Sequence, residues 1–120
     1  MHAFRFFLYA LITFIVVDGD TIKAPYGVTY RLTGFDAPEI HFAKCDYERA
    51  LGLAAKYRLE VLLLKGEARV IESGKLDKYG RTLAAVEVDG ADVGKILIKE
   101  GLARPYKGGR RKSWCDGPQS

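Results

Sequence analysis

The sequence has few of the residues that build metal-stapled folds. Only two of its 120 residues are cysteine and two are histidine, with no Cys-x-x-Cys pair and no histidine cluster. This composition argues against a structural zinc site, which takes four such ligands. Internal repeats, low-complexity tracts and linkers are also lacking. With 48% hydrophobic residues, a chain of this length predicts one domain over residues 1–120 with its own core.

Long apolar runs are lacking as well. The longest extends from Phe6 to Val17, whereas a bilayer-spanning helix takes roughly 20 residues. The run resembles a signal or anchor segment, although no small-residue cleavage site precedes Asp18. Because a strand must lead into Asp18, we interpret residues 10–17 as a buried first strand. Residues 1–9 are then its extension or the remnant of an export signal, which favours a secreted or otherwise extracytoplasmic location.

Basic residues outnumber acidic ones by 19 to 15, for a net charge of +4. This balance weakly favours a polyanionic partner, since many basic proteins bind no nucleic acid. The distribution is more informative than the total. One short segment contains no acid but five cations, Arg104, Lys107, Arg110, Arg111 and Lys112.

The two cysteines, Cys45 and Cys115, leave two alternatives open. A disulfide between them would close a loop of about 70 residues, which is worth roughly 4 kcal/mol on a chain-entropy estimate. It would also tie the start of the first helix to the C-terminal tail. Otherwise both are free buried thiols, because the sequence does not reveal the redox compartment.

Hydrophobic patterning predicts five strands and two helices. The expected strands are residues 10–17, 21–24, 28–35, 67–73 and 82–88, separated by turns rich in Gly, Pro and Asp. The expected helices are residues 46–65 and 92–100, each followed by a glycine. A helix between the third and fourth of five strands is the layout of an OB-type barrel. The predicted fold class is therefore α+β, mainly β, although an α+β sandwich would show a similar pattern.

The same patterns predict which side chains face the core. In the first helix the inward face is expected to contain Leu51, Ala54, Ala55, Leu59, Leu62 and Leu63. The solvated face is expected to contain Glu48, Arg49, Lys56, Arg58 and Glu60. In the fourth strand, Ala68, Val70 and Ile71 are expected to point inward or nearly so.

Candidate chemistry concentrates between Asp18 and Glu39. Three carboxylates there, Asp20, Asp36 and Glu39, would repel one another if they converged, unless a divalent cation or arginines neutralised them. Arg31 and the later Arg81 can supply that charge. Such a centre suits a phosphodiester, whose oxygens gain charge in the transition state.

Each of these residues also has a plain structural interpretation. Asp20 could belong to a simple turn, Asp36 and Glu39 to an acidic turn, and Arg31 to a strand surface. Arg81 could pair only with Asp77. A helix-flanked calcium loop is excluded, because its ligand, glycine and glutamate positions are taken by Ile22, Lys23 and Thr29.

Taken together, these motifs resemble the thermonuclease (staphylococcal-nuclease-like) family. The matching strings lie in the family's order over about residues 11–106, and they are Val17–Ile22, Arg31–Glu39, Asp77–Ala84 and Gly101–Ala103. The resemblance implies an OB-fold five-stranded barrel with two or three helices. It also implies calcium dependence and hydrolysis of DNA and RNA.

Carried over position by position, the resemblance assigns a role to each candidate residue. Ca²⁺ would be held by the carboxylates of Asp20 and Asp36 and by the backbone carbonyl of Ala37. Glu39 would be the general base or would orient the attacking water, and Arg31 and Arg81 would grip the phosphate. The remaining substrate contacts would come from Lys78, on a neighbouring phosphate, and from Tyr79 and Tyr106, against nucleotide rings.

Two departures from the family pattern stand out. The segment between Glu39 and the first helix is short, with only Lys44 as a cation. The tail after Tyr106 lacks a long third helix, and a bridge from Cys45 to Cys115 would take its place.

The sequence thus predicts a calcium-dependent nuclease with little base specificity and a preference for single strands, acting as a monomer without an obligate protein partner. The alternative is a catalytically inactive OB-fold module that binds nucleic acid; losses among the acidic and arginine positions would mark it, and none occurs. A protein-interaction or membrane-tethered module is a more remote third hypothesis.

Overall fold

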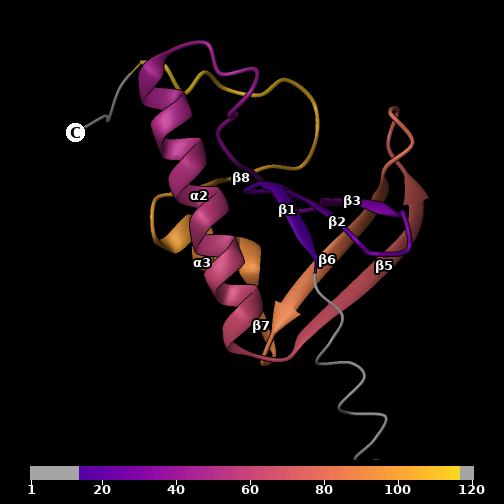
Figure 1. The fold of residues 1–120 in the computed structure, drawn as a ribbon. Helices are drawn as coiled ribbons and strands as arrows, with labels where there is room; N and C mark the ends of the chain where they lie inside the picture. Colours follow the sequence, from indigo (N-terminus) through magenta and orange to yellow (C-terminus); the bar gives the residue numbers. More distant parts are fainter. Residues whose placement is uncertain (1–13, 117–120) are drawn as a thin grey trace, which may run out of the picture.

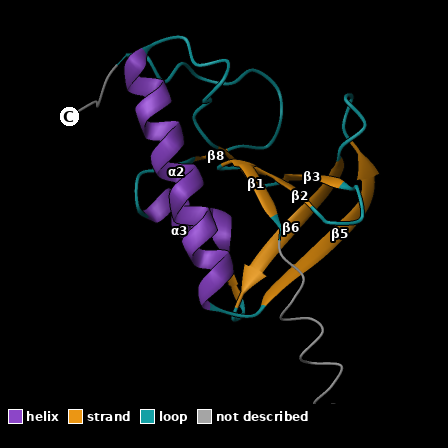
Figure 2. Cartoon of the chain, in the orientation of Figure 1, coloured by secondary structure: helices purple, strands orange, loops and turns teal. Residues whose placement is uncertain are grey.

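The structure is a computed structural model that describes residues 14–116 (Figure 1). Its main sheet has the strand order β1-β2-β3-β6-β5, with β7 paired to β6. These strands are β1 (Ile15–Asp18), β2 (Thr21–Lys23), β3 (Thr29–Leu32), β5 (Ala68–Leu76), β6 (Thr82–Val88) and β7 (Ala91–Asp92). The two helices α2 (Asp46–Lys65) and α3 (Val93–Lys99) lie on one side of the sheet (Figure 2). The predicted mixed, mainly β class and the order of its elements are therefore confirmed.

The predicted barrel does not close among the described residues. β1 and β5 stand at opposite ends of the strand order and do not pair. Pairing is antiparallel except between β3 and β6, which run parallel. The order nevertheless matches an OB-like sheet, opened at one seam.

The predicted first strand is only partly described. From Ile15 it is β1, whereas residues 10–13 and the proposed extension or signal remnant over residues 1–9 lie outside the described residues. Neither described helix combines the length and the hydropathy needed for a membrane span.

The predicted third strand, residues 28–35, is two strands. Gly34 has a φ of +92°, a left-handed conformation that interrupts the extended backbone after β3. The chain resumes as β4 (Phe35–Asp36), which pairs with β8 (Arg104–Pro105) in a separate two-stranded sheet. Asp36 therefore lies directly opposite Arg104 in the C-terminal part of the chain. Sequence patterning did not predict β8.

The core fills the space between the sheet and the helices. Its fully buried large side chains include Ile22, Tyr30, Leu32, Phe35, Leu59, Val86 and Leu97. Ile71, predicted to point inward, is 43% exposed. That expectation was wrong because successive side chains of a strand point to opposite faces of the sheet, so Ile71 faces away from the core against which Val70 packs.

The buried face of α2 differs from the predicted one. It contains Glu48, Gly52, Ala55, Leu59 and Leu62. Glu48, predicted to be solvated, is only 5% exposed, and Ala54, predicted to be core, is exposed. The prediction failed because it assumed that a carboxylate must face water, whereas Glu48 is buried by accepting backbone hydrogen bonds.

The tail folds back onto the start of α2 as an irregular segment, residues 104–115, that we call the strap. Cys115 at its end forms a disulfide with Cys45, the N-cap residue of α2, with a Cα–Cα distance of 5.9 Å. No free cysteine remains among residues 14–116. Within the strap, the Arg104 guanidinium lies 3.7 Å from the ring centroid of the buried Trp114. As the sequence led us to expect, the strap contains no third helix.

Candidate active site

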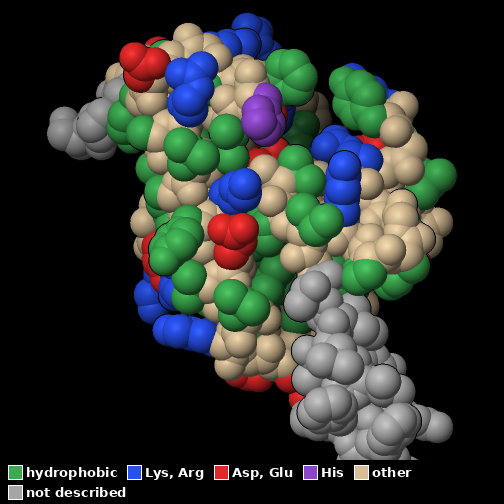
Figure 3. Space-filling view, viewed as in Figure 1, with side chains coloured by type: hydrophobic (Ala, Val, Ile, Leu, Met, Phe, Trp, Pro, Cys, Tyr) green, Lys and Arg blue, Asp and Glu red, His purple; other side chains and the backbone are tan. Residues whose placement is uncertain are grey.

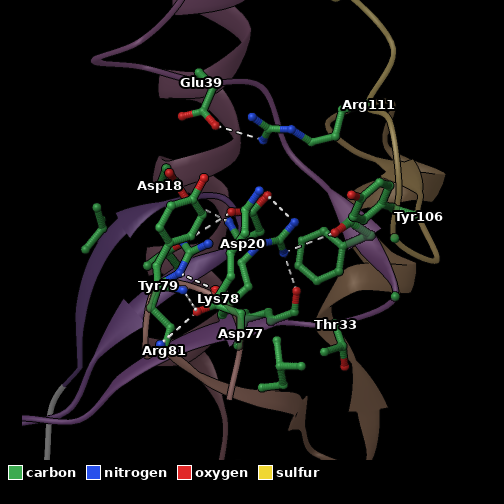
Figure 4. Close-up of a pocket in the computed structure, with 18 of the residues that line it drawn as sticks. Asp18, Asp20, Thr33, Glu39, Asp77, Lys78, Tyr79, Arg81, Tyr106 and Arg111 are labelled. Carbon is green, nitrogen blue, oxygen red and sulfur yellow. Dashed lines mark hydrogen bonds and ion pairs between the residues drawn. The ribbon is translucent and has the colours of Figure 1, made fainter. Parts of the chain in front are cut away.

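Most of the predicted site residues line one hollow in the surface. It is bounded by β1 to β3, the segment before α2, the β5–β6 loop and the strap, and Lys and Arg side chains lie beside it in the space-filling view (Figure 3). Seven of the predicted site residues line it: Asp20, Arg31, Glu39, Lys78, Tyr79, Arg81 and Tyr106. Figure 4 labels all of them except Arg31 and shows the labelled side chains coming from separate elements. Asp36 and Ala37 lie directly behind, in contact with residues that line the hollow.

Asp20 and Asp36 face the same guanidinium. Arg31 Nη2 lies 3.5 Å from Asp20 Oδ2 and 3.7 Å from Asp36 Oδ1. Arg31 Nη1 also donates to the carbonyl oxygens of Leu32 and Phe35, which holds the side chain across the break between β3 and β4. The Asp20 side chain, from the turn between β1 and β2, and the Asp36 side chain, from β4, are thereby brought to one point.

Asp20 is held by short polar contacts and by close packing. The Ala37 N–H donates to its Oδ2 at 2.8 Å, and the Thr21 hydroxyl donates to its Oδ1 at 3.2 Å. The preceding Gly19 has no room for a side chain, since a Cβ there would lie 2.7 Å from the Ala37 Cβ and 2.9 Å from the Ala55 Cβ. The turn after β1 therefore packs directly against α2 and the Ala37 side chain.

Burial and mutual repulsion make this carboxylate pair attractive to a cation. Burial, aided by the charge of Asp18, raises the pKa of Asp20 to about 7 against the opposing pull of Arg31. Burial and then the charge of Asp20 likewise raise the pKa of Asp36, although Arg111 partly counters this. Ionisation of both acids is thus less favourable than in water, and a nearby positive charge would make it more favourable.

Glu39 is positioned through its backbone by the buried Glu48. Glu48 Oε2 accepts from the Glu39 N–H at 3.0 Å, and Oε1 accepts from the Lys44 N–H at 2.9 Å. Gly52, one turn along α2, lies so close that a Cβ there would be 2.7 Å from the Glu39 carbonyl oxygen. The first turns of α2 therefore fix the path of the chain at Glu39.

Arg81 pairs with Asp77, as the plain interpretation allowed, yet it also lies in the hollow. Its Nε is 2.7 Å from Asp77 Oδ2, and its Nη1 donates to the Thr21 hydroxyl, next to Asp20, at 3.5 Å. The Tyr79 ring, 72% exposed, has both Arg81 and Lys78 within about 5.5 Å of its centroid. This loop forms a basic and aromatic side of the hollow.

Two residues at the site were missed by sequence reasoning. Arg111 Nη1 lies 3.1 Å from Asp36 Oδ1 and 2.9 Å from Glu39 Oε1. The Trp114 indole N–H donates to Asp36 Oδ2 at 3.4 Å. Arg111 was noticed only as one charge in a basic segment, and the sole signal for its place was the disulfide alternative, which would bring the tail near the first helix.

The position of Glu48 in the helix is itself a sequence signal for its contacts with the backbone before α2. It stands three residues after the N-cap Cys45, whose sulfur accepts from the Glu48 N–H at 3.4 Å. An acidic residue at this position of a helix often turns back toward the backbone that precedes the helix.

The donor set fits a hard divalent cation that needs few protein ligands. No group of three His, Cys, Asp or Glu side chains with metal-ligand spacing occurs among residues 14–116. The site instead offers the two buried carboxylates of Asp20 and Asp36, with Ala37 beside them. Ca²⁺ takes six to eight oxygen ligands in flexible geometry, so carbonyl, water and phosphate oxygens can complete such a shell.

Comparisons with known proteins point in the same direction. Residues 29–116 match the family described as Staphylococcal nuclease homologue. The SPbeta prophage-derived endonuclease YokF of Bacillus subtilis is 38% identical over 99 residues, 73% of this chain and 31% of that protein. Endonuclease YncB of the same organism is 37% identical over 99 residues, 73% of this chain and 44% of that protein.

A third relative, an uncharacterized endonuclease of Haemophilus influenzae, is 32% identical over 96 residues, 77% of this chain and 49% of that protein. The chain thus spans about a third to a half of the length of these three relatives. The family match covers well over half of the chain and includes β3, α2, β6 and the whole strap. The resemblance seen in the motifs is therefore confirmed, and this chain belongs to the staphylococcal nuclease homologue family.

Proposed function

We propose that the chain is a calcium-dependent nuclease that hydrolyses phosphodiester bonds of DNA and RNA with little base specificity. The observation that carries the proposal is the arrangement around Arg31, which faces both Asp20 and Asp36 while Glu39 and Arg81 line the same hollow. The relatives YokF and YncB, both named endonucleases, support it.

Each group has a chemical task in this proposal. Asp20, Asp36 and the Ala37 carbonyl would hold Ca²⁺, which when bound supplies positive charge to a phosphate oxygen. Glu39 would accept a proton from the water that attacks phosphorus as the P–O bond to the leaving group breaks. Arg31 and Arg81 would hold the charge that grows on the phosphate oxygens, since a guanidinium matches two such oxygens at once.

The rim of the hollow favours an unpaired strand. Tyr79 and Tyr106 offer ring faces, and Lys78 adds a cation beside Tyr79. Stacking on aromatic rings tolerates any base but needs bases that are free to unstack from a duplex. We therefore propose a single-stranded substrate.

We also propose that the enzyme is a monomer without an obligate protein partner. The Cys45–Cys115 disulfide supports a proposal that the enzyme acts in an extracytoplasmic, oxidising compartment.

The test is incubation with single-stranded DNA and RNA in calcium, in calcium with excess chelator, and in magnesium. We expect cleavage of both nucleic acids in calcium alone, with products that show no strong base preference. Binding without cleavage under all conditions would favour the alternative, a catalytically inactive OB-fold module.

Asp20→Asn should separate metal binding from folding. We expect calcium affinity, measured by calorimetry, to fall by about tenfold or more as one charged ligand is lost. The metal-free protein should be no less stable at neutral pH. The folded-state pKa of Asp20 is about 7 against an ordinary value of 3.8. Stability is therefore lost as the pH rises from the lower value to the higher one, and at neutral pH ionisation of Asp20 opposes folding.

Asp46→Asn is the matched control, since the Asp46 carboxylate is fully exposed and pairs only with Arg49 in the described structure. Its calcium affinity should equal that of the wild type. Undiminished calcium affinity in Asp20→Asn would exclude Asp20 as a ligand.

A further inference from the structure

The strap brings a third arginine to the acids of the hollow. Arg111 lies 75 residues after Asp36 in the sequence, yet its Nη1 contacts both Asp36 and Glu39 at 3.1 and 2.9 Å. Arg81 is mainly engaged with Asp77. The positive charges that face the three acids directly are therefore those of Arg31 and Arg111, as Figure 4 shows for the contact of Arg111 with Glu39.

The position of Arg111 depends on two anchors further along the strap. Trp114 is buried, donates to Asp36 Oδ2 and is covered by Arg104. Cys115 is bonded to Cys45 at the start of α2, the helix whose first turns hold Glu39. Figure 1 shows the C-terminal segment passing beside the segment that precedes α2.

We propose that Arg111 is a positioning residue of this site: its guanidinium holds the Glu39 carboxylate beside Asp36 and serves there as a built-in counter-cation, kept in place by the disulfide. The proposal rests on the function proposed above, because it takes Asp36 as a ligand and Glu39 as the base. A divalent ion would then enter a site whose negative charge is already partly neutralised by Arg111 of the strap.

Two opposite effects follow from this role. A cation beside Asp36 repels a second cation, so removal of the Arg111 charge strengthens metal binding. The same removal releases Glu39, so turnover falls even when the metal site is filled. A residue that only supported the fold would not tighten metal binding when replaced.

The first experiment is calcium titration by calorimetry on the full chain with Arg111→Gln. We expect affinity to rise by roughly three- to tenfold, the effect of one charge within several ångströms of the ion in a partly exposed site. The neighbouring Arg110→Gln removes the same net charge from an exposed side chain, and it should change affinity less than twofold. Unchanged or weaker calcium binding in Arg111→Gln overturns the proposal.

The second measurement separates positioning from a loss of fold. At saturating calcium, Arg111→Gln should lower kcat by about tenfold, in the lower range of what misplacing a catalytic group does, with little change in KM. Arg111→Lys keeps a charge that can reach one carboxylate and should restore part of kcat. An equal fall of kcat in Arg111→Gln and Arg111→Lys counts against a positioning role, and so does full activity in Arg111→Gln.

The third measurement addresses the disulfide. Reduction of the wild type should raise its calcium affinity toward that of Arg111→Gln, whereas Arg111→Gln itself should not respond to reductant, because both changes remove the same contact. If reduction and the Arg111→Gln substitution change calcium affinity additively, the disulfide does not act through Arg111. If the oxidised wild type binds no calcium, the metal assignment of the proposed function fails and this proposal falls with it, a result distinct from every outcome seen in the variants.

Discussion

Replacing Arg81 with lysine should lower turnover by about a hundredfold or more, the scale of losing one preorganised donor to a charged transition state. The guanidinium of Arg81 is already oriented by Asp77 at 2.7 Å while its Nη1 reaches Thr21 at 3.5 Å. Lysine has a single ammonium group, so it can keep the pair with Asp77 but cannot also present a planar fork to a phosphate. Single-turnover cleavage of a labelled oligonucleotide at saturating calcium measures the effect.

Arg69→Lys is the control for a general effect of replacing arginine. Arg69 is exposed on β5, and it does not line the hollow. Its replacement should leave the rate within about twofold of the wild type, the ordinary range for surface changes. A wild-type rate in Arg81→Lys would remove Arg81 from the mechanism, whatever its place in the hollow.

Gly52→Ala should both destabilise the protein and lower its turnover. A Cβ at this position would lie 2.7 Å from the Glu39 carbonyl oxygen and 2.9 Å from that of Pro38. Both atoms are backbone, so the helix and the segment must separate, which costs about 1–3 kcal/mol. This cost equals or exceeds the gain in helix propensity, about 1 kcal/mol for alanine over glycine, so the expected net loss of stability is up to about 2 kcal/mol.

The displaced backbone carries Glu39, so we expect turnover to fall by about tenfold, since small misplacements of catalytic groups have effects of this size. Denaturant unfolding and steady-state kinetics measure the two effects. Ala54→Gly is the control at an exposed position of the same helix. It should lose about 1 kcal/mol of stability through helix propensity alone and keep full activity. A Gly52→Ala variant with wild-type turnover would show that α2 does not position Glu39.

Much of the local structure could be predicted because it depends on residues close in sequence. The bounds of α2 match the predicted residues 46–65, and the polar loop before β6 lies where expected. Gly101, with a φ of +78°, follows α3 as a helix-ending glycine should. The motifs also predicted that Asp20, Arg31, Glu39 and Arg81 converge, and these four residues line one hollow.

The errors concern features that the hydrophobic pattern does not show. Gly34 divides the third predicted strand because β4 finds its partner in β8, about 70 residues later. Glu48 is buried because the Glu39 and Lys44 N–H groups satisfy it. Neither N–H group can be read from hydrophobic periodicity, although the place of Glu48 three residues after the N-cap is a capping signal. Ile71 is exposed because it follows Val70 in β5, and successive side chains of a strand face opposite sides of the sheet.

The sequence by itself determined the family, the order of strands and helices, and the set of acids and arginines that the proposed chemistry needs. The family and the set of residues follow from the resemblance of the motifs, and the order of elements follows from spacing and turn chemistry, which act over a few residues. Only the tertiary structure decided how that set is held. Arg111 faces Asp36 and Glu39 because a disulfide, a buried tryptophan and a two-residue strand pairing fold the strap back over the site, and contacts between segments so far apart leave no periodic trace in either one.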